Sequence, residues 1–229
     1  MSTDCFVVTG ASRGMGRTTV LALAALGHPV WALSRSLVSL EEQSWPNGVM
    51  LAEVNPIDAL SRDKWLKELQ NKGHRVQGLV NNAGLLLKKP FEVLTMEDFS
   101  RSMEVNVTAP AVFIQSLLPH LTPTAHVINI SSMGGFQGAS KFPGMAAYSS
   151  SKAALVCLTE VLQVEYAHTG WAFNALCLGS VQTEMLAEAF PGYVAPNSPE
   201  AMGAFIADFV VQGHRFFKGK VLPVSSTTP

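Results

Sequence analysis

The stretch Thr9-Gly10-Ala11-Ser12-Arg13-Gly14-Met15-Gly16 follows a short apolar segment, 5–9, and precedes an alanine- and leucine-rich segment that begins at Arg17. Glycines permit a tight turn, and the start of a helix attracts an anion through its dipole and its unpaired N–H groups. The glycine spacing is GxxxGxG rather than GxGxxG, and no Lys follows the last glycine as a Walker loop requires. The stretch predicts a strand–turn–helix unit that binds a pyrophosphate; on this stretch alone, a plain strand-to-helix bend is the alternative.

Short apolar segments alternate with longer segments of helical periodicity along the chain, which is typical of parallel βαβ units. The expected strands are residues 5–9, 30–34, 49–54, 78–81, 125–131, 171–177 and 221–224. The expected helices are residues 17–26, 58–71, 96–118, 147–168 and 199–211. We therefore predict one α/β domain over residues 1–229: a doubly wound, seven-stranded parallel sheet with helices on both faces and a ligand crevice at the carboxyl ends of the strands. Residues 184–198 are expected to form a loop that covers this crevice as a lid.

The composition agrees with one folded domain that has a large core. The chain of 229 residues is 48 % hydrophobic and 14 % charged, far from the polar, charged composition of disordered chains. A formal net charge of −1 gives no overall attraction to nucleic acids or anionic membranes, so neither is expected as a partner. No apolar run reaches the roughly 18 residues of a membrane span and no leader pattern is evident, so a cytoplasmic location is expected.

The three cysteines, Cys5, Cys157 and Cys177, are widely spaced and form no CxxC pair. We expect three buried, inert thiols rather than disulfides or a zinc knuckle. The six histidines show no HExxH or HxH spacing, so no metal site is expected.

The end of the second expected strand bears on the choice of a cofactor. About 20 residues beyond the glycine stretch, an NAD-binding chain places an acidic residue that contacts the ribose hydroxyls. Here Ser34 occupies that position, Arg35 follows it, and Arg13 lies within the glycine stretch. Two guanidinium groups suit a 2′-phosphate, which predicts NADP(H) in preference to NAD(H). The alternative is that both arginines are solvated surface residues.

A tyrosine and a lysine lie at the start of a long helical segment, in Tyr148-Ser149-Ser150-Ser151-Lys152. A spacing of four residues places both side chains on one helix face. A phenol with an ordinary pKa near ~10 serves as acid and base near neutrality only if a positive charge favours its anion, and Lys152 is spaced to supply that charge. A lone YxxxK pattern is common on helices, so it needs support from other segments.

Further polar segments occur in order along the chain. Asn81-Asn82-Ala83-Gly84 follows the fourth expected strand, Asn106 lies in the next helix, and Ser131-Ser132 ends the fifth strand. Together with TGASRGMG and YSSSK, these segments resemble the short-chain dehydrogenase/reductase family over nearly the whole chain. The resemblance implies a Rossmann-type fold and an oxidoreductase that transfers a hydride between a nicotinamide cofactor and a carbonyl compound or alcohol.

The resemblance implies a role for four residues of the reaction. Tyr148 matches the proton donor to the substrate carbonyl, and Lys152 matches the residue that lowers the pKa of that tyrosine and holds the nicotinamide ribose. Ser132 matches the residue that hydrogen-bonds the substrate oxygen. Asn106 matches the residue that fixes a water in a proton relay.

The cofactor residues fall into groups along the dinucleotide. They are Gly10, Ser12, Arg13, Gly14, Met15 and Gly16 for the phosphates, Ser34 and Arg35 at the 2′ position, Glu53 and Val54 for the adenine, Asn82, Ala83 and Gly84 for the adenosine ribose, and Tyr148, Lys152, Val181 and Thr183 for the nicotinamide end. The interval from Ser132 to Tyr148 is a few residues longer than is usual in the family, so Ser131 and Ser140 are alternatives to Ser132.

The substrate side is less defined by the sequence. Apolar and aromatic residues in the segments expected to border the pocket favour an apolar or aromatic carbonyl compound, and packing within loops is the alternative. These residues are Phe136, Phe142, Met145, Phe190 and Tyr193. Lys88 and Lys89 are expected to meet an acidic substrate or to be solvated charges.

Assembly and overall activity follow from the same resemblance. The family commonly assembles through helices that correspond here to residues 96–118 and 147–168, so a homodimer or homotetramer is expected. The expected apolar seam consists of Ala153, Ala154, Leu155, Leu158 and Val161. The expected activity is that of an NADP(H)-dependent carbonyl reductase, and the alternative is a non-catalytic NADP(H)-sensing binding protein of the same fold.

Overall fold

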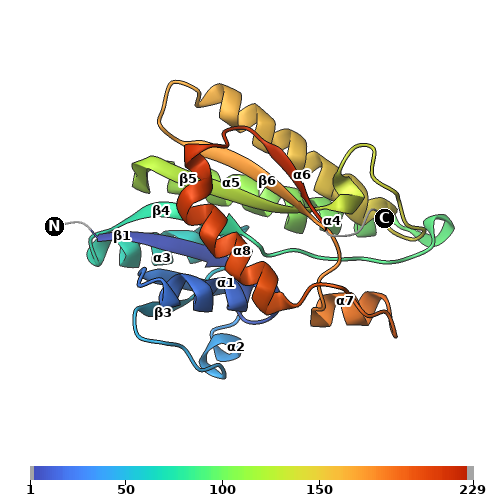
Figure 1. Ribbon diagram of the computed structural model, residues 1–229, viewed down its shortest axis with the longest axis horizontal. Coiled ribbons are helices and arrows are strands. Elements are labelled where there is room, and N and C mark those ends of the chain that lie inside the picture. Colours follow the sequence, from blue (N-terminus) through green and yellow to red (C-terminus); the bar gives the residue numbers. More distant parts are fainter. Residues whose placement is uncertain (1–2, 226–229) are drawn as a thin grey trace.

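Seven parallel strands form one sheet in the order β3-β2-β1-β4-β5-β6-β7 (Figure 1). The computed structural model describes residues 3–225. The strands are β1 (Thr3–Thr9), β2 (Val30–Ser34), β3 (Val49–Glu53), β4 (His74–Asn81), β5 (Leu121–Ser132), β6 (Ala172–Leu178) and β7 (Val221–Val224). The chain order reverses between β1 and β4, as the prediction of a doubly wound sheet requires.

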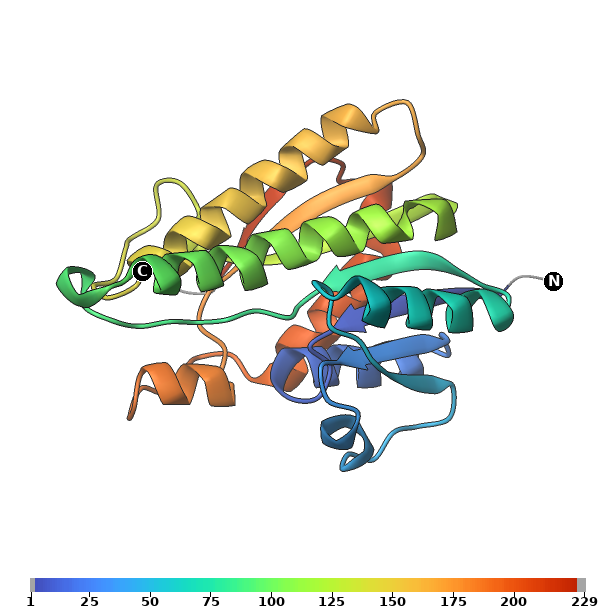
Figure 2. The ribbon, with the colours of Figure 1, turned by 180° about the vertical axis from the view of Figure 1, so that it is seen from behind.

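Helices cover both faces of this sheet, which confirms the predicted α/β Rossmann-type architecture. The helices are α1 (Gly14–Ala25), α2 (Val38–Glu41), α3 (Ala59–Asn71), α4 (Met96–Met103), α5 (Ala109–Leu117), α6 (Ala146–Glu165), α7 (Glu184–Ala189) and α8 (Pro199–Gln212). Figure 1 shows α1 and α8 in front of the sheet, and Figure 2 shows α3, α4, α5 and α6 on the opposite face.

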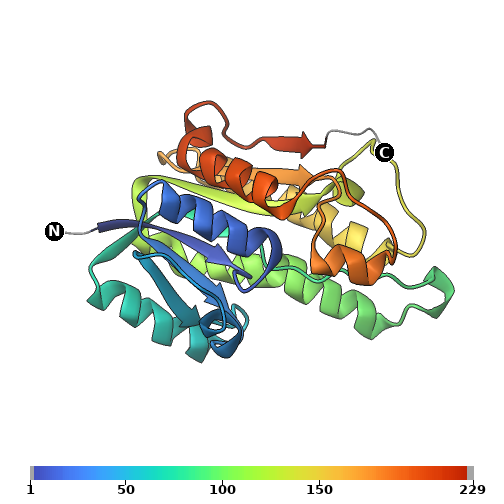
Figure 3. The same ribbon diagram turned by 60° about the horizontal axis from the view of Figure 1, so that its bottom comes forward.

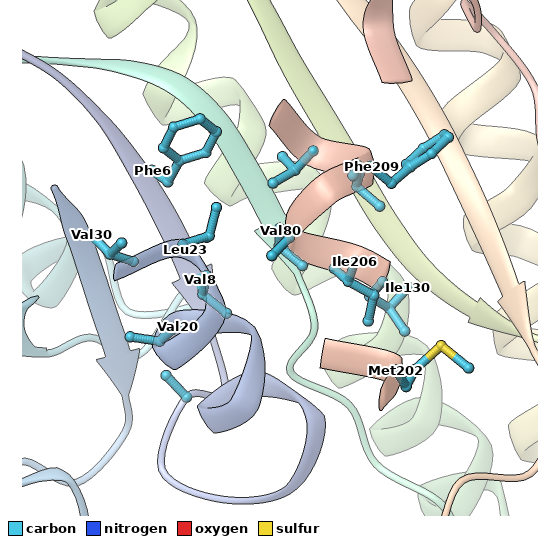
Figure 4. Packing of buried hydrophobic residues seen from close by; sticks show 14 of the residues in the cluster. Phe6, Val8, Val20, Leu23, Val30, Val80, Ile130, Met202, Ile206 and Phe209 are labelled. Carbon is cyan, nitrogen blue, oxygen red and sulfur yellow. The ribbon is translucent and has the colours of Figure 1, made fainter. Parts of the chain in front are cut away.

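The alternation of side chains along the strands builds one hydrophobic layer on each face. Phe6 and Val8 of β1 point to the α1 and α8 side, where they join the cluster drawn in Figure 4. Cys5 and Val7 point to the other side, whose cluster includes Trp65 of α3 and residues of α5. Because successive strand residues face opposite ways, each buried strand contributes to both layers and the sheet is held rigid between them.

Close packing of α8 on α1 fixes where the lid segment ends. A Cβ on Gly203 would lie 2.2 Å from Oγ1 of Thr18, so only glycine allows the two helices to approach this closely. The Thr18 hydroxyl also donates to the Pro199 carbonyl at 2.6 Å. The contact of α1 with the start of α8 therefore fixes the position where segment 184–198 ends.

Several local expectations differ from the structure. The helix predicted over 96–118 is broken by a π-helical turn, Glu104–Thr108, between α4 and α5. The lid predicted as a loop contains α7, which begins because the Thr183 hydroxyl accepts from the Leu186 N–H at 3.3 Å. The six residues of α7 were not predicted as a helix because proline and aromatic residues follow them closely and indicate a loop. The four-residue helix α2 was also missed.

Two expectations about α6 are wrong. Cys157 is exposed, whereas Cys5 and Cys177 are buried as predicted. Leu155 is 1 % exposed and packs toward the sheet, so it does not belong to an outward apolar seam, although Val161 is 46 % exposed. The sequence shows that this helix is apolar on several sides, and only the packing against β5 and β6 decides which side faces out.

The described residues 3–225 include no helix long and apolar enough to cross a membrane. Within the same range, no group of three or more His, Cys, Asp or Glu side chains is arranged to hold a metal ion.

Candidate active site

A cleft of about 830 Å³ lies at the carboxyl ends of the strands. It opens where the strand order reverses, which is the place where ligands bind in doubly wound sheets. Its lining comes from the glycine turn after β1, the ends of β2, β4, β5 and β6, and the start of α6. Figure 3 shows α7 beyond the same ends of the strands. The volume lies within the usual range of roughly 300–1,000 Å³ for ligand sites.

The glycine turn is built for an anion. Gly10 and Gly14 have φ of +66° and +53°, in the left-handed region that favours glycine. A Cβ on Gly16 would lie 2.2 Å from the Gly10 carbonyl oxygen, so no larger residue fits there. The N-cap residue of α1, Arg13, makes no side-chain capping bond, and the first turn carries no acidic residue. The uncapped N–H groups and the helix dipole therefore fit the pyrophosphate of a dinucleotide.

Two side chains, Thr9 at the end of β1 and Asn82 just after β4, hold this turn in place. The Thr9 hydroxyl accepts from the N–H groups of Asn82 and Ala83, each at 3.1 Å. The Asn82 amide donates to the carbonyls of Thr9 and Gly10 at 3.0 and 3.1 Å. The two hydrogen bonds from the Asn82 amide therefore hold β1 and β4 together at the turn. Asn82, Ala83 and Gly84 all line the cleft.

Three polar side chains meet at the opposite end of the cleft. Tyr148 and Lys152 lie on the first turns of α6, and the Lys152 Nζ is 5.9 Å from the centre of the Tyr148 ring. The Ser132 side chain, at the end of β5, is hydrogen-bonded to Tyr148. Lys152 donates from Nζ to the Ile130 carbonyl at 2.8 Å, which fixes its ammonium beside the strand end.

Burial controls the ionisation of both groups. It lowers the pKa of the Lys152 ammonium to about 8, because the charged form is poorly solvated there. Burial also raises the pKa of the Tyr148 phenol, and the hydrogen bond with Ser132 opposes that rise. Lys152 is not among the groups that shift the Tyr148 pKa in this structure, and its ammonium is bonded to the Ile130 carbonyl; a lowering of the Tyr148 pKa by Lys152 beside a bound nicotinamide stays a prediction.

Asn106 sits at the π-helical turn and links the segment that follows β4 to α6. Its Oδ1 accepts from the Leu85 N–H at 2.8 Å, and its Nδ2 donates to the Leu85 carbonyl and to the Ser151 hydroxyl, both at 2.9 Å. A Cβ on Gly84 would lie 3.2 Å from the Asn106 Oδ1 and 3.3 Å from the Lys152 Nζ. The π-turn, a feature often found at functional sites, thus brings Asn106, Gly84 and Lys152 together.

The two arginines line the cleft at the glycine turn and at the end of β2, away from Tyr148 and Lys152. Ser34, Arg35 and Val54 line it, as does Arg13 from the glycine turn. Glu53 lies outside the lining and uses its carboxylate to accept from the Leu37 N–H at 3.2 Å, which braces the turn after β2.

Comparison of the sequence with models of known protein families identifies the family of this chain. The model described as short chain dehydrogenase matches residues 4–193. The chain belongs to the short-chain dehydrogenase family. Its members are oxidoreductases, and the fold binds a nicotinamide cofactor.

Known short-chain dehydrogenases resemble it along most of their length. A 3-oxoacyl-[acyl-carrier-protein] reductase of Synechocystis is 31 % identical over 193 residues, which are 78 % of this chain and 74 % of that protein. A 3-ketoacyl-(acyl-carrier-protein) reductase of Brucella melitensis, solved with NADH, has a TM-score of 0.85 at 22 % identity and covers 97 % and 96 % of the two chains. ElxO, solved with NADP, has a TM-score of 0.84 at 23 % identity and covers 98 % and 97 %. The last two show the shared fold.

Nearly all the site residues predicted for a short-chain dehydrogenase line one cleft. The exceptions are Gly16, Glu53 and Asn106, which support the lining from behind. Val181 and Thr183 line the cleft at the start of the lid, where Thr183 also caps α7.

The three candidate serines are separated by their surroundings. Ser131 and Ser132 both line the cleft, but Ser132 bonds Tyr148, whereas Ser131 is buried and donates its hydroxyl to the Lys152 carbonyl at 2.9 Å. Ser140 is exposed and outside the cleft lining. The geometry favours Ser132 as the serine that faces the substrate oxygen.

Sequence reasoning missed two supporting residues. Thr9 and Ser151 hold the glycine turn and Asn106, respectively. Thr9 lies in the glycine stretch and Ser151 lies between Tyr148 and Lys152, so the sequence motifs themselves could have indicated that these two hydroxyls support the site.

Proposed function

We propose that this short-chain dehydrogenase is an NADP(H)-dependent oxidoreductase that interconverts a carbonyl compound and an alcohol. The observation that carries the proposal is the meeting of Tyr148, Ser132 and Lys152 at one end of a cleft whose other part is the uncapped, glycine-built turn. When bound, the nicotinamide cofactor supplies or accepts the hydride.

The side chains of the chain itself handle the proton. Tyr148 donates its phenolic proton to the carbonyl oxygen during reduction and recovers one from solvent afterwards; in oxidation it accepts the alcohol proton. Ser132 donates a hydrogen bond to the same oxygen and orients it toward Tyr148. Lys152, held by the Ile130 carbonyl, keeps a cation near the phenol, and Asn106 holds the start of α6 against the segment that follows β4.

The charges at the far end of the cleft support NADP(H) over NAD(H). Arg13 and Arg35 line the cleft together, and Ser34 occupies the place of an acidic residue that would repel a 2′-phosphate. Titration of NADPH and NADH against the wild type and Arg35→Ala tests this point. Equal affinities of the wild type for both cofactors contradict the preference.

The lining near Tyr148 supports an apolar or aromatic substrate. Phe142, Met145, Phe190 and Tyr193 all line the cleft, whereas Phe136 does not. Lys88 and Lys89 lie outside the lining, and Lys89 is paired with Asp98 at 2.7 Å, so neither supports an acidic substrate.

The deciding experiment is cofactor oxidation with a panel of aromatic and aliphatic ketones, aldehydes, quinones and diketones. Tyr148→Phe is run beside the wild type, and Tyr166→Phe, at the other end of α6, serves as the matched control. Turnover lost in Tyr148→Phe and kept in Tyr166→Phe supports the proposal. Tight NADPH binding without turnover on any compound favours the non-catalytic, NADP(H)-sensing alternative.

A further inference from the structure

The short lid helix α7 faces the phosphate-binding end of the cleft with two carboxylates. Glu184 and Glu188 are four residues apart and thus share one helix face. Oε1 of Glu188 is 3.4 Å from Nη1 of Arg13. Oε2 of Glu184 is 3.5 Å from the position that a Cβ on Gly14 would occupy. Each carboxylate therefore lies against one of the two positive features of the turn, the Arg13 guanidinium and the uncapped start of α1.

These two positive features differ in what they recognise. The start of α1 fits the pyrophosphate, which NADH and NADPH share. The Arg13 guanidinium fits the 2′-phosphate, which NADPH alone carries. A carboxylate bound to Arg13 therefore competes with one cofactor, and a carboxylate above Gly14 competes with both.

We propose that Glu188 is a cofactor-specificity residue, which moderates the preference for NADP(H) by holding Arg13 toward the lid. The inference rests on the proposed NADP(H) preference. The Glu188 carboxylate competes with a 2′-phosphate for the Arg13 guanidinium and repels it, whereas a 2′-hydroxyl leaves the ion pair undisturbed. The Arg13 and Glu188 side chains are 54 % and 67 % exposed, so the pair is weak and the exchange is readily reversible.

The test is a set of titrations of NADPH and NADH with purified wild type, Glu188→Gln, Glu184→Gln and Arg13→Ala at low ionic strength. Glutamine keeps the size of the side chain and removes its charge. We expect Glu188→Gln to bind NADPH about two- to five-fold more tightly, as suits an exposed ion pair, with the NADH affinity unchanged. The gain shrinks in high salt, which screens exposed charges.

Two variants separate this effect from a general change of charge. Glu184→Gln is expected to strengthen the binding of both cofactors by the same factor, because it opposes the shared pyrophosphate. Glu165→Gln, an exposed position at the far end of α6, is expected to change neither affinity.

The outcomes distinguish this inference from the proposed cofactor preference. If Arg13→Ala abolishes a clear preference for NADPH while Glu188→Gln leaves both affinities unchanged, or shifts them equally, the role of Glu188 is wrong and the preference stands. If the wild type binds both cofactors equally and Arg13→Ala alters neither affinity, both ideas are wrong.

Discussion

At the scale of single residues, Asn106 connects two segments of the fold, at Leu85 and Ser151, besides lying beside the candidate site. All the bonds of its amide run to the Leu85 main chain and the Ser151 hydroxyl, inside a fully buried setting. We predict that Asn106→Ala lowers the free energy of unfolding by about 2–4 kcal/mol, because the Leu85 N–H and C=O lose their partners. Urea unfolding measures the loss.

Ser151→Ala is the comparison for Asn106→Ala, since it removes one of the three bonds of Asn106 together with the bond from the Ser151 hydroxyl to the Tyr148 carbonyl. It is expected to cost about 1 kcal/mol. If Asn106→Ala unfolds at the urea concentration of the wild type, Asn106 does not hold α6 to the segment that follows β4.

Residue types and spacing predicted most of the site. The carboxyl ends of parallel strands meet at one edge of a sheet, so Ser132, Tyr148 and Lys152 come together wherever the fold is formed. What the sequence did not reveal is the direction of side chains. Asn82 and Glu53 turn toward neighbouring main-chain groups, and that choice depends on contacts across strands that no local pattern encodes.

At the scale of elements, strand and helix types were predicted better than their limits. The strand 30–34 and the strand 221–224 were predicted to the residue, while β4 and β5 begin four residues before the apolar runs that revealed them. Most of those added residues are polar, and two of them, Gln77 and Thr122, bond each other across the strands at 2.7 Å, so hydrophobicity does not mark these extensions.

The lid has a second attachment on the substrate side. The Lys88 ammonium lies 4.0 Å from the centre of the Phe190 ring, and the next residue, Lys89, donates its N–H to the Gly144 carbonyl at 2.9 Å. We predict that Lys88→Met, which keeps the length of the side chain without its charge, opens the lid roughly two- to five-fold more often, as the loss of an exposed cation–π contact of ~0.5–1 kcal/mol implies. Hydrogen exchange of residues 184–198 measures the opening.

Lys72→Met provides the comparison for the lid, because Lys72 makes a looser contact with Trp31 at 6.0 Å and lies at the end of α3. It is expected to leave exchange in 184–198 unchanged. Equal exchange in Lys88→Met and the wild type contradicts an attachment by Lys88.

At the scale of the whole molecule, a buried histidine contributes to the response to acid. His126 on β5 is fully buried, bonds the Val210 carbonyl through Nδ1 at 3.1 Å, and faces the Asn174 amide through Nε2 at 2.9 Å. Burial lowers its pKa from 6.5 to about 4, and neighbouring His214, with ring centres 5.8 Å apart, also disfavours the charge. His126 thus ties β5, β6 and α8 together as a neutral ring.

The unfolded chain binds more protons than the folded one between the two pKa values of His126. We therefore predict that the free energy of unfolding falls as the pH drops from about 6.5 toward 4, by at most roughly 3 kcal/mol from this group. Thermal unfolding across this pH range measures the fall. In His126→Gln the slope is expected to flatten, and in the exposed variant His168→Gln it is expected to persist; an unchanged slope in His126→Gln argues against His126 as its source.

The exposed thiol of Cys157 makes the native protein easy to label. Cys5 and Cys177 are buried in the sheet, so a maleimide dye added to the folded chain is directed to Cys157 on the outer side of α6, wherever a partner subunit leaves that thiol uncovered. That helix is also where subunit contact is expected. When chains labelled with a donor dye are mixed with chains labelled with an acceptor dye, resonance energy transfer occurs only where two molecules bring these helices close together. The distance between partner chains can then be followed in solution without altering the sequence.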